Sequence, residues 1–389
     1  MTLKSFIRFR DTMMLVLALS IGTVGGALFH LLRLPLAWMI GAMVATAAAA
    51  IGGATLAVPR RFRNAMVVIL GVLLGGAFTP AIFTQAGTWL VSLSALVPYV
   101  ALTTLIGLAY LRRIGGYDVT TAFFTATPGG LSEMTMVGGA LGGDEAAISL
   151  AHSLRVIMVV MVVPVWFQLT HGETSTLAPA LTNALAGARA ALPGPPLSTL
   201  SLWEWALLAG CALGAPAARL VRLPASFLIG PMIVSAVVHG LGVSAVQPPG
   251  VLVAAAQVAV GAAIGCRFTG VDLHTLGRGA VIALGLTGLT LGLTMVLALT
   301  LHRTTGLGLG ALILAFTPGG LTEMSLVALS LGFDVAFVST HHIVRILLIV
   351  ALAPLAYATW DRLRTVKSGA KPGAKPGALP PVSEPTSLR

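Results

Sequence analysis

Two octapeptides of almost identical sequence carry the residues of this chain that are best suited to chemistry. They read Thr-Pro-Gly-Gly-Leu-Ser-Glu-Met at 127–134 and Thr-Pro-Gly-Gly-Leu-Thr-Glu-Met at 317–324. Because proline removes a backbone donor and Pro-Gly-Gly continues a helix poorly, each octapeptide is expected to break a helix. Both lie in apolar sequence, where an open backbone is tolerated only if protein or a watery cavity covers it. A broken membrane helix with an acidic residue beside it, present twice, is typical of a transporter core.

Each break also predicts a binding site for an anion. Thr127 and Thr317 are expected to cap a half-helix, with Pro128 and Pro318 at the first helical position. The unpaired N–H groups and the positive end of the helix dipole would then face the middle of the bilayer and attract an anion or a carboxylate substrate. The alternative is a glycine-rich break that only permits close helix packing. The glycines concerned are Gly129, Gly130, Gly319 and Gly320.

Each octapeptide contains a carboxylate, Glu133 or Glu323, that is expensive to place at membrane depth. Such a group is expected to bind a coupling proton or Na⁺, since burial and neighbouring charges change its proton affinity. The alternative is a carboxylate with a purely structural role.

Further along each half of the chain, a histidine and an arginine stand three residues apart, as His152 with Arg155 and as His342 with Arg345. This spacing places both side chains on one helical face. An arginine in mid-span needs a partner, so each Arg is predicted to pair with the Glu of its own octapeptide. It either locks the broken segment to the next helix or holds an anionic substrate in its fork.

Asp144 and Asp334 follow the broken segments and complete the set of candidate binding residues. Each is expected near a membrane interface. Each could serve the transported solute or could simply start the next helix as an N-cap.

The elements that carry these residues are duplicated along the chain. The two breaks lie 190 residues apart, at Pro128 and Pro318. A match this long indicates an internal repeat. The corresponding segments are Arg33-Leu34-Pro35 with Arg222-Leu223-Pro224, Gly71 and Gly75 with Gly261 and Gly265, Phe78-Thr79 with Phe268-Thr269, and Pro164 with Pro354. The paired Gly-x-x-x-Gly motifs are expected to allow tight helix packing.

Composition places the chain in a membrane. Of its 389 residues, 57% are hydrophobic and 9% are charged, whereas soluble domains carry about a quarter charged residues. The net charge of +11 does not indicate nucleic-acid binding, because Lys and Arg concentrate in short loops and in the tail. The predicted fold class is an all-α polytopic membrane protein. Its predicted parts are a basic N-terminus 1–11, repeat one at 12–169, a linker 170–200, repeat two at 201–360 and a disordered basic tail 361–389.

The distribution of positive charge favours two inverted repeats, each of five crossings and one re-entrant hairpin, with both termini cytoplasmic. If the broken segments cross fully, five arginines fall outside; if they dip in and return, only Arg33, Arg189 and Arg303 do. Helix length supports the same topology. The two halves of each broken segment are expected at 118–127 with 129–142 and at 308–317 with 319–332. Neither half can span the membrane alone, because ten and fourteen helical residues cover about 15 and 21 Å, whereas the hydrocarbon core is about 30 Å thick.

The sequence resembles the AbrB-type membrane protein family, or AbrB duplication family, whose members carry labels such as ammonia monooxygenase and AbrB family transcriptional regulator. The resemblance rests on the duplicated octapeptides and on the Asp, His and Arg that follow each, and it covers residues 12–360. The family is similar to a larger grouping of ion transporters with inverted repeats and re-entrant hairpins. The resemblance therefore implies secondary transport, with organic anions among the candidate solutes. One class of members is associated with regulation of the flavoprotein AidB.

Together these observations predict a secondary transporter of a small solute, with an anion as one option, that works by alternating access in the bacterial inner membrane. Its expected partners are the lipid bilayer, the solute and a coupling H⁺ or Na⁺; no nucleic acid, metal or cofactor is expected, and homodimerisation is compatible with such folds. The alternative is a membrane-bound regulator of gene expression, although the loops are short and the tail has no helix-turn-helix pattern. A metal-dependent monooxygenase is a remote alternative, since only Glu323, Asp334, His341 and His342 offer clustered ligands.

Overall fold

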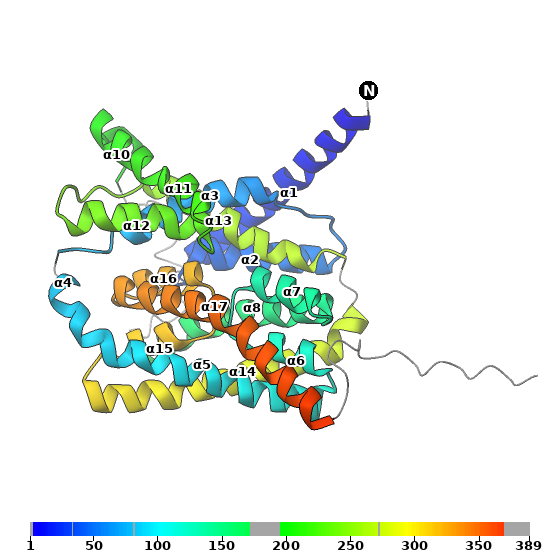
Figure 1. The fold of residues 1–389 in the computed structure, drawn as a ribbon. Coiled ribbons are helices and arrows are strands. Elements are labelled where there is room, and N and C mark those ends of the chain that lie inside the picture. The colour runs from blue at the N-terminus through cyan, green and yellow to red at the C-terminus, as the bar shows by residue number, and fades with distance from the viewer. Residues whose placement is uncertain (1–2, 33, 81, 172–194, 271–272, 369–389) are drawn as a thin grey trace, which may run out of the picture.

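The computed structural model describes residues 3–32, 34–80, 82–171, 195–270 and 273–368, and every regular element among them is a helix (Figure 1). The all-α prediction is confirmed at this level. The helices of the first half are α1 (Leu3–Leu31), α2 (Ala37–Ile51), α3 (Arg60–Gly75), α4 (Ile82–Gln85), α5 (Leu90–Tyr110), α6 (Val119–Ala126), α7 (Leu131–Ala140) and α8 (Glu145–His171). Those of the second half are α10 (Leu202–Ala212), α11 (Gly214–Leu220), α12 (Ser226–Gly240), α13 (Gly250–Gly265), α14 (Leu273–Thr305), α15 (Leu309–Phe316), α16 (Leu321–Ser330) and α17 (Val335–Ser368).

Several of these helices are long and apolar, as a membrane protein requires. In the described part of the chain, six are long and apolar enough to cross a bilayer. They include the segments Arg10–Leu31, Ala86–Gly115, Glu145–Phe167, Gly250–Phe268, Gly279–Thr305 and Val335–Trp360. The shorter α2 and α12, at 15 residues each, cover about 22 Å. The start of the second half is divided at Leu213 into the two short helices α10 and α11.

The helices form two layers, each built from both halves of the chain (Figure 1). One, here called the scaffold layer, contains α1, α2, α3 and α10 to α13. The other, the hairpin layer, contains α5 to α8 and α14 to α17. Within the scaffold layer, helices of one half of the chain pack against helices of the other half: α3 packs on α12, and α13 packs on α2.

The paired Gly-x-x-x-Gly motifs lie where helices of the two halves approach each other closely. A Cβ added at Gly71 would meet the backbone oxygen of Leu228 at 2.6 Å, and one added at Gly261 would collide with the backbone oxygen of Met39. Small residues let helix backbones approach in this way. The prediction of tight packing at these glycines is confirmed.

Each broken segment doubles back on itself. The backbone N–H of Asp144, beyond the end of α7, donates a 2.8 Å hydrogen bond to the hydroxyl of Thr121 near the start of α6. In the second half, a Cβ at Gly310, near the start of α15, would collide with the ring of Phe333, beyond the end of α16. The half-helices α6 and α7 contain 8 and 10 residues and cover about 12 and 15 Å. Each break therefore lies at the tip of a helical hairpin.

The predicted part boundaries differ from the helix ends near both ends of the chain. Helix α1 begins at Leu3, inside the predicted N-terminal segment 1–11, and α17 continues to Ser368, past the predicted start of the tail at 361. Most of the linker, 172–194, and the end of the tail, 369–389, lie outside the described residues.

Candidate functional site

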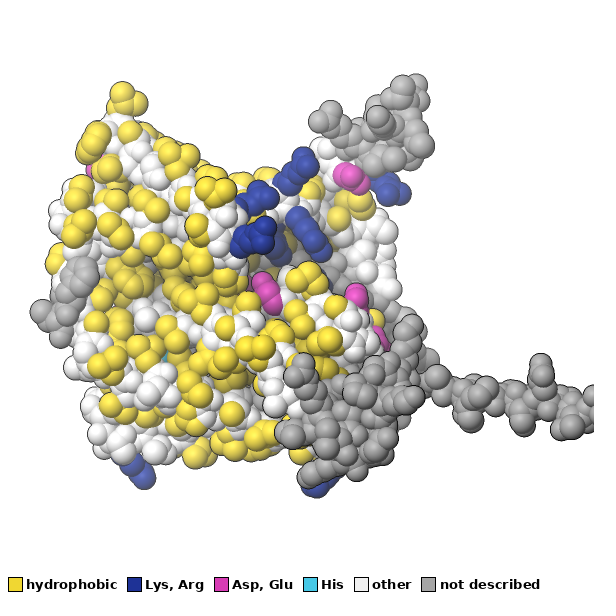
Figure 2. Space-filling model, viewed as in Figure 1, with side chains coloured by type: hydrophobic (Ala, Val, Ile, Leu, Met, Phe, Trp, Pro, Cys, Tyr) yellow, Lys and Arg dark blue, Asp and Glu magenta, His cyan; other side chains and the backbone are white. Residues whose placement is uncertain are grey.

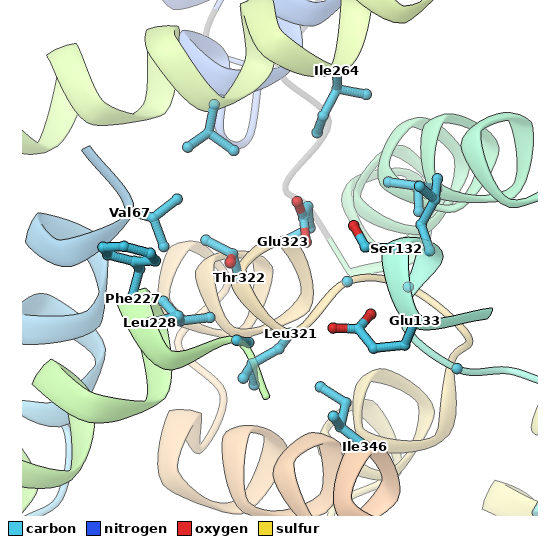
Figure 3. A pocket seen from close by; sticks show the side chains of 18 of the residues that line it. Val67, Ser132, Glu133, Phe227, Leu228, Ile264, Leu321, Thr322, Glu323 and Ile346 are labelled. Carbon is cyan, nitrogen blue, oxygen red and sulfur yellow. The ribbon is translucent and has the colours of Figure 1, made fainter. Parts of the chain in front are cut away.

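The tips of both hairpins line one cavity of about 400 Å³ between the two layers (Figure 3). Across the cavity, the wall is formed by the start of α3, the end of α13 and the loop that leads into α12. Of the predicted site residues, those that line it are Pro128, Gly129, Gly130, Glu133, Arg155, Gly319, Gly320, Glu323 and Arg345. The lining does not include Thr127, Asp144, His152, Thr317, Pro318, Asp334 or His342.

Thr127 and Thr317 end one half-helix instead of starting the next. The Thr127 hydroxyl donates to the Phe123 carbonyl oxygen at 2.8 Å, and the Thr317 hydroxyl donates to that of Ile313 at 2.7 Å. Because each hydroxyl is engaged one turn back, it does not accept from the helix that follows. The prediction that these threonines cap the second half-helix, with proline at its first position, is wrong.

The second half-helices begin three residues later, with glycine at the cap. The N-caps of α7 and α16 are Gly130 and Gly320, and neither cap has a side-chain hydrogen bond. The first N–H groups of a helix have no backbone partner within it, so both helices direct donors and a positive dipole end toward the tips that line the cavity. At α16 the Glu323 carboxylate accepts from its own backbone N–H.

The two glutamates occupy the third position of these half-helices and fold back over the caps. A Cβ added at Gly130 would collide with the carboxylate of Glu133, and one at Gly320 with that of Glu323. A side chain at either cap would therefore displace the carboxylate from the position it has in this structure. Figure 3 shows the two carboxylates on different half-helices beside the shared cavity.

The arginines hold the breaks by their carbonyl oxygens. Arg345 donates from Nη1 to the carbonyl oxygens of Phe316 and Thr317, at 3.2 and 2.9 Å, and from Nη2 to that of Gly319 at 3.2 Å. Arg155 donates from Nη2 to the carbonyl oxygen of Gly129 at 3.2 Å. The Nε atoms of both arginines are buried without a hydrogen-bond partner.

The predicted ion pairs between these arginines and the glutamates of the octapeptides are wrong, since no such contact within ion-pair distance exists among the described residues. Glu323 instead interacts electrostatically with Arg267 and Arg63, on the far wall of the cavity. An open backbone turn buried in apolar surroundings exposes carbonyl oxygens that need donors, and a guanidinium supplies several at once.

The histidines tie each hairpin to the next long helix. His152 Nε2 lies 3.0 Å from the carbonyl oxygen of Phe124, and His342 Nε2 lies 3.0 Å from that of Leu314. A carbonyl oxygen only accepts, so Nε2 carries the hydrogen and Nδ1 is the acceptor. Nδ1 of His342 accepts from Arg345 Nη2 at 2.9 Å, as the three-residue spacing on one face permits.

Asp144 and Asp334 are helix caps. The Asp144 carboxylate accepts from the backbone N–H groups of Ala146 and Ala147, at 2.9 and 3.0 Å, and that of Asp334 accepts from Phe337 at 2.9 Å. Both lie outside the cavity lining, so their geometry matches the N-cap alternative. Among the described residues, no three His, Cys, Asp or Glu side chains lie close enough together to hold a metal ion. The residues considered as ligands for a monooxygenase, Glu323, Asp334, His341 and His342, therefore do not form such a cluster.

Two arginines and one amide residue of the cavity lining were not predicted as part of the site: Arg63 and Asn64 at the start of α3 and Arg267 just after α13. The comparison of the two repeats did not single out the arginines, because the positions equivalent to Arg63 and Arg267 hold Val253 and Ala77. The sequence feature that could have identified these residues is a charged or amide side chain at the end of an apolar span. With them, the lining holds four arginines and two glutamates, a formal charge of +2.

The two tips differ in exposure. On α7, Ser132 is exposed and Glu133 is half-buried, whereas on α16 the equivalent Thr322 and Glu323 are only 8% and 9% exposed. The cavity therefore opens beside the first hairpin and is closed around the second.

The long apolar helices, the internal duplication and the two paired breaks define a polytopic membrane protein with a shared polar cavity. The chain belongs to the AbrB family: the family model described as "Transition state regulatory protein AbrB" matches residues 38–361. It is 27% identical over 372 residues to "Uncharacterized protein YhjN" of Bacillus subtilis (strain 168), covering 91% of this chain and 94% of that protein. It is 27% identical over 342 residues to "Putative regulator AbrB" of Escherichia coli (strain K12), covering 87% and 92%. The family resemblance read from the octapeptides is confirmed.

Proposed function

We propose that this protein is a secondary transporter that moves a small anion across the bacterial inner membrane by alternating access around the two breaks. The observation that carries the proposal is the convergence of two half-helix N-termini and four arginines on one cavity. Helix N-termini and guanidinium groups both favour anions, and broken helices of this kind form the binding sites of many transporters.

An inverted arrangement of the repeats is supported by the directions of α3 and α13, which are equivalent in the duplication. Arg63 at the start of α3 lines the cavity with Arg267, just after α13, while Val72 late in α3 lies beside a groove with Leu252 early in α13. The two helices therefore run antiparallel. Equivalent helices that cross a membrane in opposite directions belong to repeats of opposite topology, with the two hairpins re-entering from opposite sides.

Glu133 and Glu323 are the proposed carriers of the coupling H⁺ or Na⁺. Each lies in the first turn of a half-helix, within reach of the solute cavity, and carboxylates at membrane depth bind cations or protons to offset their burial. Arg155 and Arg345 hold the tips in shape and offer their remaining donors to the anion.

The open side of the cavity is proposed to face the cytoplasm. Arg60 and Arg61 stand at the start of α3, next to the opening, and the positive-inside rule assigns this end of the helix to the cytoplasm, with both termini. In this topology the structure represents an inward-open form.

The test is transport by the purified protein in liposomes that contain no other protein. We expect wild type to catalyse counterflow of a labelled anion, and E133Q/E323Q to abolish it while remaining folded by circular dichroism. The matched control is E145Q, which removes an exposed carboxylate at the start of α8. Full transport by the double variant would sink the assignment of the glutamates, and absence of transport by wild type across carboxylate, phosphate and sulfonate solutes would sink the transporter.

The alternative is a membrane-bound regulator, which rests on the descriptions of the family and of the Escherichia coli relative as regulators. The liposome experiment separates the two functions, because a regulator without transport activity leaves the labelled gradient unchanged.

A further inference from the structure

A second cavity, of about 580 Å³, continues the first one toward the surface and is here called the vestibule. The two cavities share Arg63, Asn64, Leu131, Ser132 and Arg267. Because these five residues line both, a single solute lying across their junction contacts both. Figure 2 shows Lys and Arg side chains gathered in one region of the molecular face in view.

The vestibule is more cationic than the cavity behind it. Arg60, Arg63 and Arg267 line it, and its lining includes no Asp or Glu. Helix α8 adds Ser149 and Ser153, which are four residues apart and thus lie on one helical face. A pocket with three guanidinium groups and a row of hydroxyls supplies donors and no fixed negative charge.

The arginines at the junction donate hydrogen bonds to neutral side chains in the vestibule, while Glu323 in the cavity behind acts on both of them electrostatically. Arg63 Nη2 donates to the Asn64 side-chain oxygen at 3.3 Å, and Arg267 Nη1 donates to the Ser153 hydroxyl at 3.4 Å. Arg63 Nε is buried without a partner, and the charges of Arg63 and Arg267 oppose each other. Like charges held close together in a partly buried site favour binding of an anion between them.

Resting on the proposed function, we infer that the vestibule is an outer subsite of the same pathway and that the solute carries at least two anionic groups, carboxylate or phosphate. One group binds among Arg60, Arg63 and Arg267, and the other binds at the hairpin tips beside Arg155 and Arg345. A solute with a single negative charge fills one subsite and leaves the guanidinium groups of the other subsite without a bound anion.

The experiment compares anions of different charge and measures binding and transport separately. Acetate, succinate, citrate and inorganic phosphate are added to purified protein in detergent while thermal unfolding is followed, and each is then offered in counterflow to protein in phosphatidylcholine liposomes. Succinate or citrate is expected to raise the unfolding temperature and to be transported, whereas acetate is not.

The variant R60A tests the vestibule, and R61A is its matched control. Arg61 is the adjacent exposed arginine of the same helix, but it does not line either cavity. R60A is expected to bind the dianion about two- to fivefold more weakly, the size of one exposed charge contact, and R61A is expected to bind as wild type does.

The outcomes separate this inference from the proposed function. Equal binding of acetate and succinate, or equal affinity of R60A and R61A, overturns the inference and leaves an anion transporter. If binding is selective for dianions and depends on Arg60 but no counterflow occurs, the inference of two anion subsites is supported and the proposed transport function is overturned. If short-chain phosphatidylglycerol stabilises the protein while the soluble polyanions do not, the vestibule is a lipid headgroup site and the inference is overturned.

Discussion

Arg345 Nη2 lies 2.9 Å from Nδ1 of His342, whereas the equivalent nitrogen of His152, three residues before Arg155, is buried without a partner. The same contrast extends to the breaks, where Arg345 donates to three carbonyl oxygens and Arg155 to one. Two copies of one motif thus have different hydrogen bonds, with the tighter set in the closed hairpin and the looser set in the open one. In alternating access the two sets are expected to exchange.

The arginines should therefore contribute unequally to stability. R345A leaves two buried carbonyl oxygens and one partly buried carbonyl oxygen without this donor and is expected to lower the free energy of unfolding by about 3 kcal/mol, while R155A costs about 1–2 kcal/mol. Thermal unfolding in detergent, with R61A as the control for loss of an exposed arginine, measures the difference. Equal losses for R345A and R155A would show that the asymmetry is not a property of the resting protein.

Thiol labelling should differ between the two tips. Cys at Ser132 is expected to react with a bulky impermeant reagent from the cytoplasmic side, and Cys at Thr322 to be protected, because Ser132 is exposed and Thr322 is 8% exposed. The background must lack Cys211 and Cys266, which are both free thiols. These positions are better than Gly130 and Gly320, where a side chain would collide with a glutamate. Equal labelling of both tips from one side would contradict the one-sided opening and weaken the inverted arrangement.

The cap glycines should be needed for transport through the position of the carboxylate. G320A is expected to displace the Glu323 side chain and to reduce counterflow at least tenfold in protein that still folds, since a 1 Å misplacement in a site costs about 100-fold. Gly292 on α14 is the matched control, because a Cβ there meets nothing within 4 Å and G292A should transport normally. Normal transport by G320A would remove the carboxylate position from the mechanism.

The aspartates should behave as caps and not as transport residues. D144A and D334A are each expected to lower the free energy of unfolding by about 1 kcal/mol, the usual effect of losing an N-cap, and to keep counterflow rates near those of wild type. Flux and thermal unfolding measured on the same preparations decide the point. Loss of flux in a variant of normal stability would return Asp144 or Asp334 to the binding site.

The amino-acid sequence alone determined the membrane class, the duplication and the position of both breaks. These depend on local properties: apolar composition, the helix-breaking Pro-Gly-Gly and a repeat visible residue by residue. The halves of the two broken segments were found within the residues predicted for them, and the prediction that each His–Arg pair shares one helical face agrees with the Arg345–His342 hydrogen bond.

Only the tertiary structure decided what each polar group contacts. Thr127 turned back to its own half-helix, Arg345 took backbone carbonyl oxygens instead of a glutamate, and Arg267 joined a cavity that the repeat pattern could not assign to it. The physical reason is that a buried donor binds whichever acceptor packing brings within about 3 Å. Here the packing is between two layers that each mix both halves of the chain, so spacing along one half does not predict the partner.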